Sequence, residues 1–212
     1  MSMEILQNAH NQGACDIVCS SHNWMHTKEY YKNFKILKQE AKKHFGINLH
    51  TGCEVYCDSE NIYDIINQLD SGEIFTINNT NYVLVEFDPY EYKEDIIFCV
   101  TKLIAHGYEP IIAHVERYFE LIKDENLIRI FYDNNILFQI NCYSLVDEQN
   151  LEIKNFARKM LKNEMVSFIG SDAHRTDHRP YAIKNGIDYI FNNCNHDYAE
   201  EICYKNATIL FN

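Results

Sequence analysis

The stretch "VSFIGSDAH", residues 166–174, is an apolar run that ends abruptly in an acid, a small residue and a histidine. The run is typical of a strand buried in a protein core, whereas Asp172 and His174 carry side chains that titrate and bind metal ions. Five other apolar runs in the chain lead into polar side chains of a similar kind. The predicted fold class rests on this recurrence.

Six short runs rich in Val, Ile and aromatic residues are the expected strands. They lie at residues 16–20, 47–55, 82–87, 110–114, 136–141 and 165–170. The runs lack a clean two-residue alternation, which indicates that both faces of the sheet are buried. Helical patterns separate the runs, and most of them stop near a glycine. These glycines are Gly13, Gly46, Gly72 and Gly107, and later helices are expected at 151–161 and 198–205. Strands that alternate with helices predict a parallel α/β architecture.

Every expected strand leads into side chains that can bind a metal or donate a hydrogen bond. These side chains are His22, Glu54, Glu86, His114, Gln139 with Asn141, and Asp172 with His174. In an α/β barrel the carboxyl ends of all strands converge on the active site, whereas an open doubly wound sheet uses mainly one switch point. Six such ends favour a barrel. A barrel should begin with a strand, but residues 1–13 form a helical pattern, so we expect that a first strand is missing from this sequence.

The composition fits a single domain over residues 1–212. With 46% hydrophobic residues the chain can bury one sizeable core, and no low-complexity tract divides it. The net charge of −12 argues against a nucleic-acid partner and against binding to anionic membranes. It does not exclude an anionic small substrate, because a bound metal ion reverses the sign of the local electrostatic field.

The termini and the cysteines indicate a cytoplasmic protein. Neither a signal peptide nor an apolar run of the ~20 residues that span a bilayer is visible. The eight cysteines suit a reducing compartment. The pairs Cys15/Cys19 and Cys53/Cys57 have a C-x3-C spacing that a zinc site could use. The apolar segments in or beside which Cys15, Cys19, Cys53 and Cys99 lie favour small buried hydrophobic residues instead.

Three imidazoles and three carboxylates at the strand ends form a candidate metal site. They belong to His22, Glu54, Glu86, His114, Asp172 and His174. Mixed nitrogen and oxygen ligands suit Mn, Fe or Zn, and two such ions roughly 3.5–4 Å apart activate water and bind phosphoryl oxygens. Arg117 follows His114 by three residues, and Arg179 follows His174 by five. Guanidinium groups bind phosphate, so the sequence predicts a phosphoesterase with Arg117, Arg179 and His174 as catalytic residues.

Each of these residues also has a structural alternative. The alternatives are a surface position for His22, a satisfied core position for His114, a helix cap for Glu54 or Asp172, and a surface ion pair of Arg117 with Glu116 or Glu120. Glu86 is harder to explain in this way, because an unpaired carboxylate within "YVLVEF" costs several kcal/mol to bury. The coincidence of all of them at strand ends favours a site. His26 and His178 are close enough in the sequence to remain further candidates.

The order and spacing of several short segments resemble those of a known superfamily. The segments are "SSH" (20–22), "GCEVY" (52–56), "TINNTNYVLVEF" (76–87), "PIIAHVERY" (110–118), "FQIN" (138–141) and "GSDAH" (170–174). They resemble the PHP (polymerase and histidinol phosphatase) superfamily. Within it the chain is similar, over essentially its whole length, to the manganese-dependent bacterial tyrosine-protein phosphatases of capsule and exopolysaccharide operons (CpsB/CapC-like).

This resemblance implies a distorted, TIM-like (βα)7 barrel with two or three Mn2+ ions. It implies that the six strand-end residues above are metal ligands and that Arg117 and Arg179 hold the phosphate. The implied reaction is hydrolysis of phosphotyrosine on a bacterial tyrosine autokinase by attack of a metal-bound hydroxide. The implied consequence is regulation of capsular or exopolysaccharide synthesis.

The chain departs from the family pattern at its beginning. The family opens with a strand that carries D-x-H-x-H and an acidic pair, and this sequence starts after them, so we expect an N-terminally truncated domain. Asn23 stands where the family often has another histidine. Two alternatives therefore stay open: a PHP-type phosphatase of a small phosphomonoester such as histidinol phosphate, or a catalytically impaired phosphotyrosine-binding module. A barrel that lacks a strand also exposes two sheet edges. Exposed edges favour association between copies of the chain, so a homo-oligomer is a further expectation.

Overall fold

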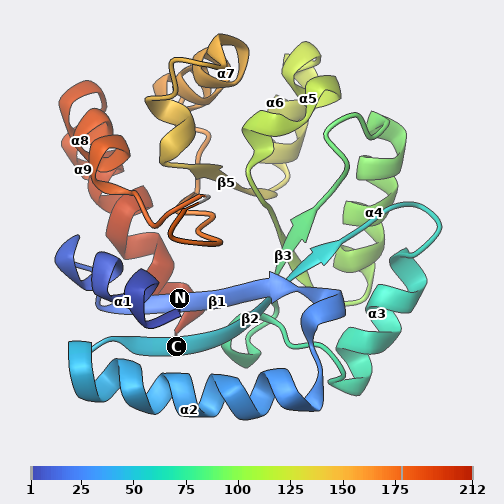
Figure 1. Cartoon of the computed structure of the whole chain (residues 1–212). Coiled ribbons are helices and arrows are strands. Elements are labelled where there is room, and N and C mark those ends of the chain that lie inside the picture. Colours follow the sequence, from blue (N-terminus) through green and yellow to red (C-terminus); the bar gives the residue numbers. More distant parts are fainter. Residues whose placement is uncertain (1, 178, 212) are drawn as a thin grey trace.

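A curled parallel sheet forms the centre of the molecule. The structure, a computed structural model, describes residues 2–177 and 179–211. The strand order of the sheet follows the chain, β1-β2-β3-β4-β5-β6. The strands are β1 (Asp16–His22), β2 (Asn48–Tyr56), β3 (Tyr82–Glu86), β4 (Glu109–Ile112), β5 (Leu137–Asn141) and β6 (Phe168–Gly170). Figure 1 shows the sheet curling on itself with helices arranged around it. The predicted TIM-like parallel α/β fold is confirmed, and the expected additional first strand stays a prediction.

Helices connect the strands on the outside of the sheet. They are α1 (Ser2–Asn11), α2 (Lys28–Phe45), α3 (Ile62–Ser71), α4 (Lys93–Ala105), α5 (Phe119–Lys123), α6 (Glu125–Asp133), α7 (Leu151–Lys162), α8 (Lys184–Asn193) and α9 (His196–Glu200). The predicted glycine stops are confirmed. Gly46 and Gly72 end α2 and α3 in the left-handed conformation, each with φ 71°, which a residue without a Cβ adopts at no steric cost.

The structure differs from the sequence prediction in several elements. The sixth strand begins at Phe168 rather than at residue 165, because the hydroxyl of Tyr198 binds the N–H of Val166 at 2.9 Å and its carbonyl at 3.1 Å. Those two groups are thereby unavailable to the sheet. Helices α5, α6 and α8 were not expected, and the last expected helix starts earlier, at His196. Cys15 is exposed, so the prediction that it is buried was wrong.

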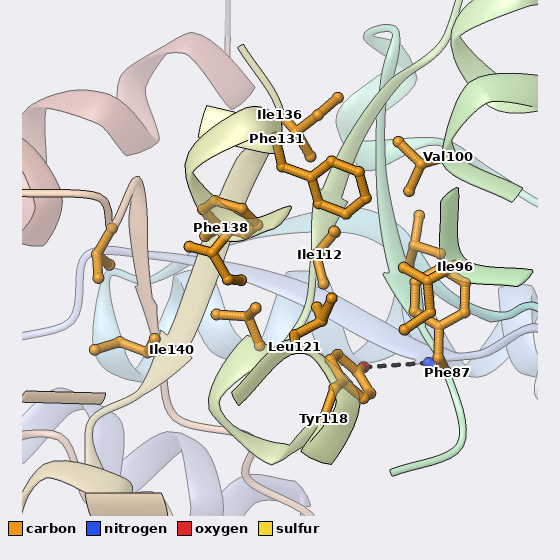
Figure 2. Close-up of a cluster of buried hydrophobic side chains, with 14 of the residues drawn as sticks. Phe87, Ile96, Val100, Ile112, Tyr118, Leu121, Phe131, Ile136, Phe138 and Ile140 are labelled. Atoms are coloured by element: carbon orange, nitrogen blue, oxygen red, sulfur yellow. Dashed lines mark hydrogen bonds between the residues drawn. The ribbon is translucent and has the colours of Figure 1, made fainter. Parts of the chain in front are cut away.

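The main hydrophobic core lies between the outer face of the strands and the surrounding helices. In Figure 2, Ile112 and Phe138 from β4 and β5 face Ile96 from α4 and Phe131 from α6. All four side chains are buried. Burial of a side chain of this size stabilises a fold by roughly 1.5–3 kcal/mol relative to exposure. This packing fixes the strands, and thereby fixes the side chains at the strand ends.

The inside of the curled sheet is apolar at one end and polar at the other. An apolar group fills the end where the strands begin, and its members include Val18, Leu84, Ile111, Phe168 and Leu210. Successive side chains of a strand alternate between its two faces. His22 therefore lies on the same inner face as Val18, and Glu86 on the same inner face as Leu84. The carboxyl end of the interior is consequently lined by groups that bind ions.

A side chain links the segment before β1 to the segment after β6, the two edge strands of the described sheet. The amide of Gln12, just after α1, donates to the carbonyl of Tyr181 at 2.8 Å. Its oxygen accepts from the N–H groups of Ile183 at 3.0 Å and Lys184 at 3.2 Å. We call the contact between Gln12 and residues 181–184 the seam. The seam ties α1 to the loop that carries the last predicted site residues.

None of the helices in residues 2–177 and 179–211 has both the length and the apolar composition that a membrane crossing requires.

Candidate metal and phosphate site

Four of the predicted ligands lie together at the carboxyl end of the sheet. Ligand atoms of His22, Glu54 and Glu86 all lie within 4.8 Å of one another. The register of the sheet places the first two side by side, because His22 pairs with Glu54 across β1 and β2. The Nε2 of His114 lies 3.2 Å from Oε1 of Glu54 and 3.3 Å from Oε1 of Glu86. We call these four residues the metal cluster.

The imidazole of His114 is held from both sides. Its backbone is left-handed, with φ 33°, and its N–H donates to the side-chain oxygen of Gln139 at 2.9 Å. Its Nδ1 lies 3.3 Å from the hydroxyl of Tyr118, which also accepts from the N–H of Phe87 at 3.1 Å, as the dashed line in Figure 2 shows. A non-glycine residue in this conformation persists only where its surroundings fix it. The ring is therefore oriented toward the two carboxylates by its neighbours.

The electrostatics of the metal cluster favour a cation. Burial opposes the charge on His114, but hydrogen bonds to Glu54 and Glu86 outweigh it and raise the pKa of this imidazole to about 9. Burial also opposes the charge on Glu86, yet the hydrogen bond and charge of His114 hold the pKa of that carboxyl below its usual value. Two carboxylates thus stabilise positive charge between them.

The donor set of the metal cluster also fits a metal ion. The Nδ1 of His22 is buried and has no hydrogen-bond partner of good geometry among the described residues. It lies 3.3 Å from Oε2 of Glu86 and 3.8 Å from Oε2 of Glu54. A buried imidazole nitrogen without a proton partner, next to two carboxylates, offers the mixed nitrogen and oxygen ligation of Mn, Fe or Zn.

The remaining predicted residues form a second group around Asp172. One oxygen of its carboxylate, Oδ2, lies 2.7 Å from a guanidinium nitrogen of Arg117 and 3.2 Å from one of Arg179. The same oxygen accepts from the amide of Asn141 at 3.1 Å, and Oδ1 lies 3.4 Å from Nδ1 of His174. We call Arg117, Asp172, His174 and Arg179 the arginine group. The structure places Asp172 and His174 with the arginines, whereas their role as metal ligands stays a prediction.

The loop of the arginine group has an unusual backbone. Asp172 and Arg179 have φ values of 49° and 52°, and the N–H of His174 donates to the carbonyl of Arg179 at 2.9 Å. Burial opposes the charge of Asp172, but Arg117 and the neighbouring cations outweigh it and lower the pKa of this carboxyl. Gly170 precedes the loop, and a Cβ there would overlap the side chain of Gln139. A side chain at this position would displace the amide of Gln139, so glycine leaves room for the interior amides beside β6.

The metal cluster and the arginine group are adjacent. The rings of His22 and His174 have centroids 6.3 Å apart. Charge coupling also links them, because Asp172 acts on the pKa of Glu86 and His114 acts on that of Asp172. The site therefore combines a cation-binding pair of carboxylates with two guanidinium groups that already hold an anionic oxygen.

One structural alternative is wrong, and one of the two open histidines lies outside the metal cluster. Arg117 does not pair with Glu116 on a helix surface, because Glu116 is fully buried and accepts from Ser144 at 2.7 Å and from the N–H of Asn141 at 3.1 Å. His26 is engaged by the hydroxyl of Tyr31 at 2.8 Å and by a backbone carbonyl, outside the metal cluster. The other open histidine, His178, lies outside the described residues.

Sequence reasoning missed Glu116 and Trp24. Glu116 follows a predicted ligand by two residues, and its charge suggested a surface position. Trp24 lies in a three-residue turn after β1 and stacks on the ring of His22, with centroids 4.3 Å apart. Its proximity to "SSH" was the available signal, but no periodic pattern pointed to it.

The fold and the site define a TIM-like α/β protein with a candidate metal centre, in which histidines and carboxylates lie beside two arginines. The chain belongs to the capsular polysaccharide synthesis family CpsB/CapC, which it matches over residues 1–212. A tyrosine-protein phosphatase CpsB from Streptococcus agalactiae is 29% identical over 97% of this chain and 88% of its own length. The tyrosine-protein phosphatase YwqE from Bacillus subtilis is 26% identical over 99% of this chain and 83% of its own length.

A solved structure has the same fold. It comes from work on YwqE of Bacillus subtilis and CpsB of Streptococcus pneumoniae, described there as metal-dependent tyrosine phosphatases. It superposes with a TM-score of 0.82, covers 99% of this chain and 85% of the other, and shares 22% sequence identity.

Proposed function

We propose that this protein is a metal-dependent phosphoric monoester hydrolase that removes phosphate from tyrosine on a bacterial tyrosine autokinase. The observation that carries the proposal is the adjacency of the metal cluster and the arginine group. Family membership supports it, because relatives of this chain are named tyrosine-protein phosphatases. In this role the protein would regulate capsular or exopolysaccharide synthesis in the cytoplasm, and the free cysteines suit such a reducing compartment.

The metal cluster would hold the ion. His22, Glu54, Glu86 and His114 supply two imidazoles and two carboxylates, and Asp172 and His174 would complete the ligand set. Mn2+ is the proposed metal, with Fe or Zn as chemically similar candidates. When bound, such an ion acts as a Lewis acid on water and phosphoryl oxygens.

The arginine group would bind the phosphate. Arg117 and Arg179 converge on a single carboxylate oxygen of Asp172, so their guanidinium groups are already oriented toward one anionic position. A phosphate offers several oxygens to these donors, and guanidinium forks bind such oxygens in a bidentate way. His174 uses Nδ1 for the carbonyl of Asp172 at 3.0 Å, which leaves Nε2 as the nitrogen that would bind the ion.

The sequence leaves two alternative functions open, and the experiment also tests them. A phosphatase of a small phosphomonoester would use the same cluster and arginines. A phosphotyrosine-binding module would use the arginines without turnover. A homo-oligomer is compatible with each of the three.

The test is hydrolysis of a phosphotyrosine peptide with and without added Mn2+. We expect metal-dependent turnover that falls at least about a hundredfold in His114→Ala and in Arg179→Ala, because each removes a group that contacts charge at the reacting centre. The matched controls are His106→Ala and Arg129→Ala, which change surface residues of the same types. Unchanged rates in both site variants would contradict the proposal.

The same assay separates the alternatives. Strong preference for histidinol phosphate over the peptide would favour the small-substrate phosphatase. Stoichiometric binding of the peptide without turnover, at saturating Mn2+, would favour the binding module.

A further inference from the structure

A large exposed aromatic side chain stands next to the metal cluster. Trp24 is 60% exposed, although tryptophan gains much from burial. Its indole stacks on the imidazole of His22 at 4.3 Å with an angle of 16° between the rings, and meets Tyr56 edge-on at 6.4 Å. One face of the indole is therefore fixed against a cluster residue, while most of the side chain remains open.

The turn that carries Trp24 is anchored on both sides. The N–H of Tyr56 donates to the side chain of Asn23 at 3.4 Å, which ties the turn to β2. The N–H of His26 donates to the carbonyl of Asn23 at 3.1 Å, and its ring contacts the carbonyl of Ser21 at 3.1 Å. The indole is thus presented by an ordered backbone. An ordered aromatic surface binds a ligand ring with little loss of side-chain entropy.

The rest of the site is charged. The metal cluster and the arginine group contribute carboxylates, imidazoles and guanidinium groups, which suit the phosphate half of a phosphomonoester. The organic half needs an apolar partner. In an aryl phosphate the aromatic ring is separated from phosphorus by one oxygen, so the ring must lie close to the groups that hold the phosphate. Trp24 is an exposed aromatic surface in contact with those groups through His22.

We propose that Trp24 binds the aromatic ring of the substrate and makes the site selective for aryl over alkyl phosphomonoesters. This inference rests on the proposed phosphatase function and names the residue that would recognise the tyrosine side chain. Offset stacking and edge-to-face contacts between aromatic rings favour association by about two- to tenfold beyond the effect of buried area. The competing role for Trp24 is to orient His22 alone, and that role predicts no discrimination between aryl and alkyl esters.

A binding experiment tests the inference without turnover. Trp24 is the single tryptophan among 212 residues, so selectively excited tryptophan emission reports on this position. The probes are phenylphosphonate and methylphosphonate, which carry the same anionic group with and without a ring. With the Mn2+-loaded full chain, we expect phenylphosphonate to change Trp24 emission and to bind about tenfold more tightly than methylphosphonate by calorimetry.

Two variants of Trp24 and one control variant complete the binding experiment. Trp24→Leu should bind both phosphonates with nearly equal affinity, and Trp24→Phe should restore part of the preference. Tyr204→Ala, which removes another exposed aromatic ring beyond α9, should keep the full preference. Equal affinities of the wild-type protein for the two probes, no binding of either probe, or binding of phenylphosphonate without a change in emission would overturn the inference.

Kinetics distinguish failure of this inference from failure of the proposed function. We expect Trp24→Leu to lower kcat/KM about tenfold for a phosphotyrosine peptide, mainly through KM, and to leave a phosphoserine peptide nearly unchanged. Equal losses in kcat for both peptides would mean that Trp24 only positions His22, and would overturn the inference. Absence of wild-type turnover combined with retained phenylphosphonate preference would refute the phosphatase function and support the aryl-binding role.

Discussion

Glu116 is a buried carboxylate that joins the segments following two neighbouring strands. Its Oε1 accepts from the hydroxyl of Ser144 and from the N–H of Asn141, while Oε2 has no hydrogen-bond partner among the described residues. Burial raises the pKa of this carboxyl. Asn141 in turn donates to Asp172, so Glu116 helps to hold the residue that binds the carboxylate of the arginine group.

Replacement of Glu116 separates its hydrogen bonds from its charge. Glu116→Ala should lower the free energy of unfolding by about 2–3 kcal/mol, because two buried donors lose their acceptor. Glu116→Gln keeps one acceptor oxygen and should cost less. Urea unfolding of both variants measures the difference, with Glu120→Ala, near the surface of α5, as the control. Equal losses in the two Glu116 variants would contradict the role of the hydrogen bonds.

His26 gives a pH dependence whose direction follows from burial. Burial lowers the pKa of His26 below 6.5, although a hydrogen bond to the carbonyl of Ser21 acts in the opposite direction. Below pH ~6.5 the unfolded chain therefore binds a proton more readily than the folded chain. The contribution of His26 to stability is fully present above that pH and is lost as the pH falls.

The measurement is the urea midpoint at several values between pH ~5 and ~7.5. His26→Gln should show a shallower loss of stability toward acid than the wild-type protein, because the variant no longer takes up this proton on unfolding. His106→Gln, at an exposed helix end, serves as the matched control. A slope unchanged by His26→Gln would rule out this contribution.

At the residue scale, the sequence predicted which side chains gather but not how they pair. A residue at the end of a buried strand is forced toward the carboxyl edge of the sheet, which is why His22, Glu54 and Glu86 were identifiable. The partners of Asp172 depend on its left-handed backbone, and a single sequence gives no signal for that conformation at an aspartate. The exposed position of Trp24 depends on a three-residue turn that no periodic pattern marks.

At the scale of elements, helix ends were predictable where the backbone demands a particular residue. Glycine after α2 and α3 is such a case. α8 offers no comparable signal, because it begins after Ile183 without a side-chain cap and ends before Cys194 in extended conformation. α5 has five residues, too few for a helical period to show. β6 is short because Tyr198 competes for its backbone.

The seam joins α1 to the loop of the arginine group, so its loss should loosen that loop. Gln12→Ala removes one donated and two accepted hydrogen bonds, and should lower the free energy of unfolding by about 1–2 kcal/mol. Hydrogen exchange should show faster exchange for amides of residues 181–184. Turnover should fall modestly, since Arg179 lies just before these residues.

The matched control for the seam is Gln7→Ala, within α1. Gln7 donates to Asn11 on the exposed surface, and its loss should leave exchange in the loop unchanged. Equal exchange rates at residues 181–184 in both variants would show that Gln12 does not restrain the loop.

At the scale of the whole molecule, metal binding should stabilise the fold. The metal cluster draws its residues from β1, β2, β3 and the segment after β4, so an ion there would link strands that are distant in the chain. A ligand at a hundred times its Kd stabilises the folded state by about 2.7 kcal/mol. We expect Mn2+ to raise Tm, and a chelator to reverse the effect.

Variants test whether the metal cluster is the source of the Mn2+-dependent stabilisation. His22→Ala and Glu86→Gln should greatly reduce the Mn2+-dependent rise in Tm, whereas His44→Ala, a surface change on α2, should retain it. A full Tm shift in both cluster variants would mean that the ion binds elsewhere.

The strand order of the sheet has a consequence for the way the chain assembles. Each strand pairs with the one that precedes it, so the sheet can grow by successive addition of neighbouring units. The seam instead joins positions 169 residues apart, and closing so long a loop carries an entropic cost that no local pairing offsets. We therefore expect the seam to form late in folding. The cation-binding half of the site would then exist in a partly folded chain before the anion-binding half is in place.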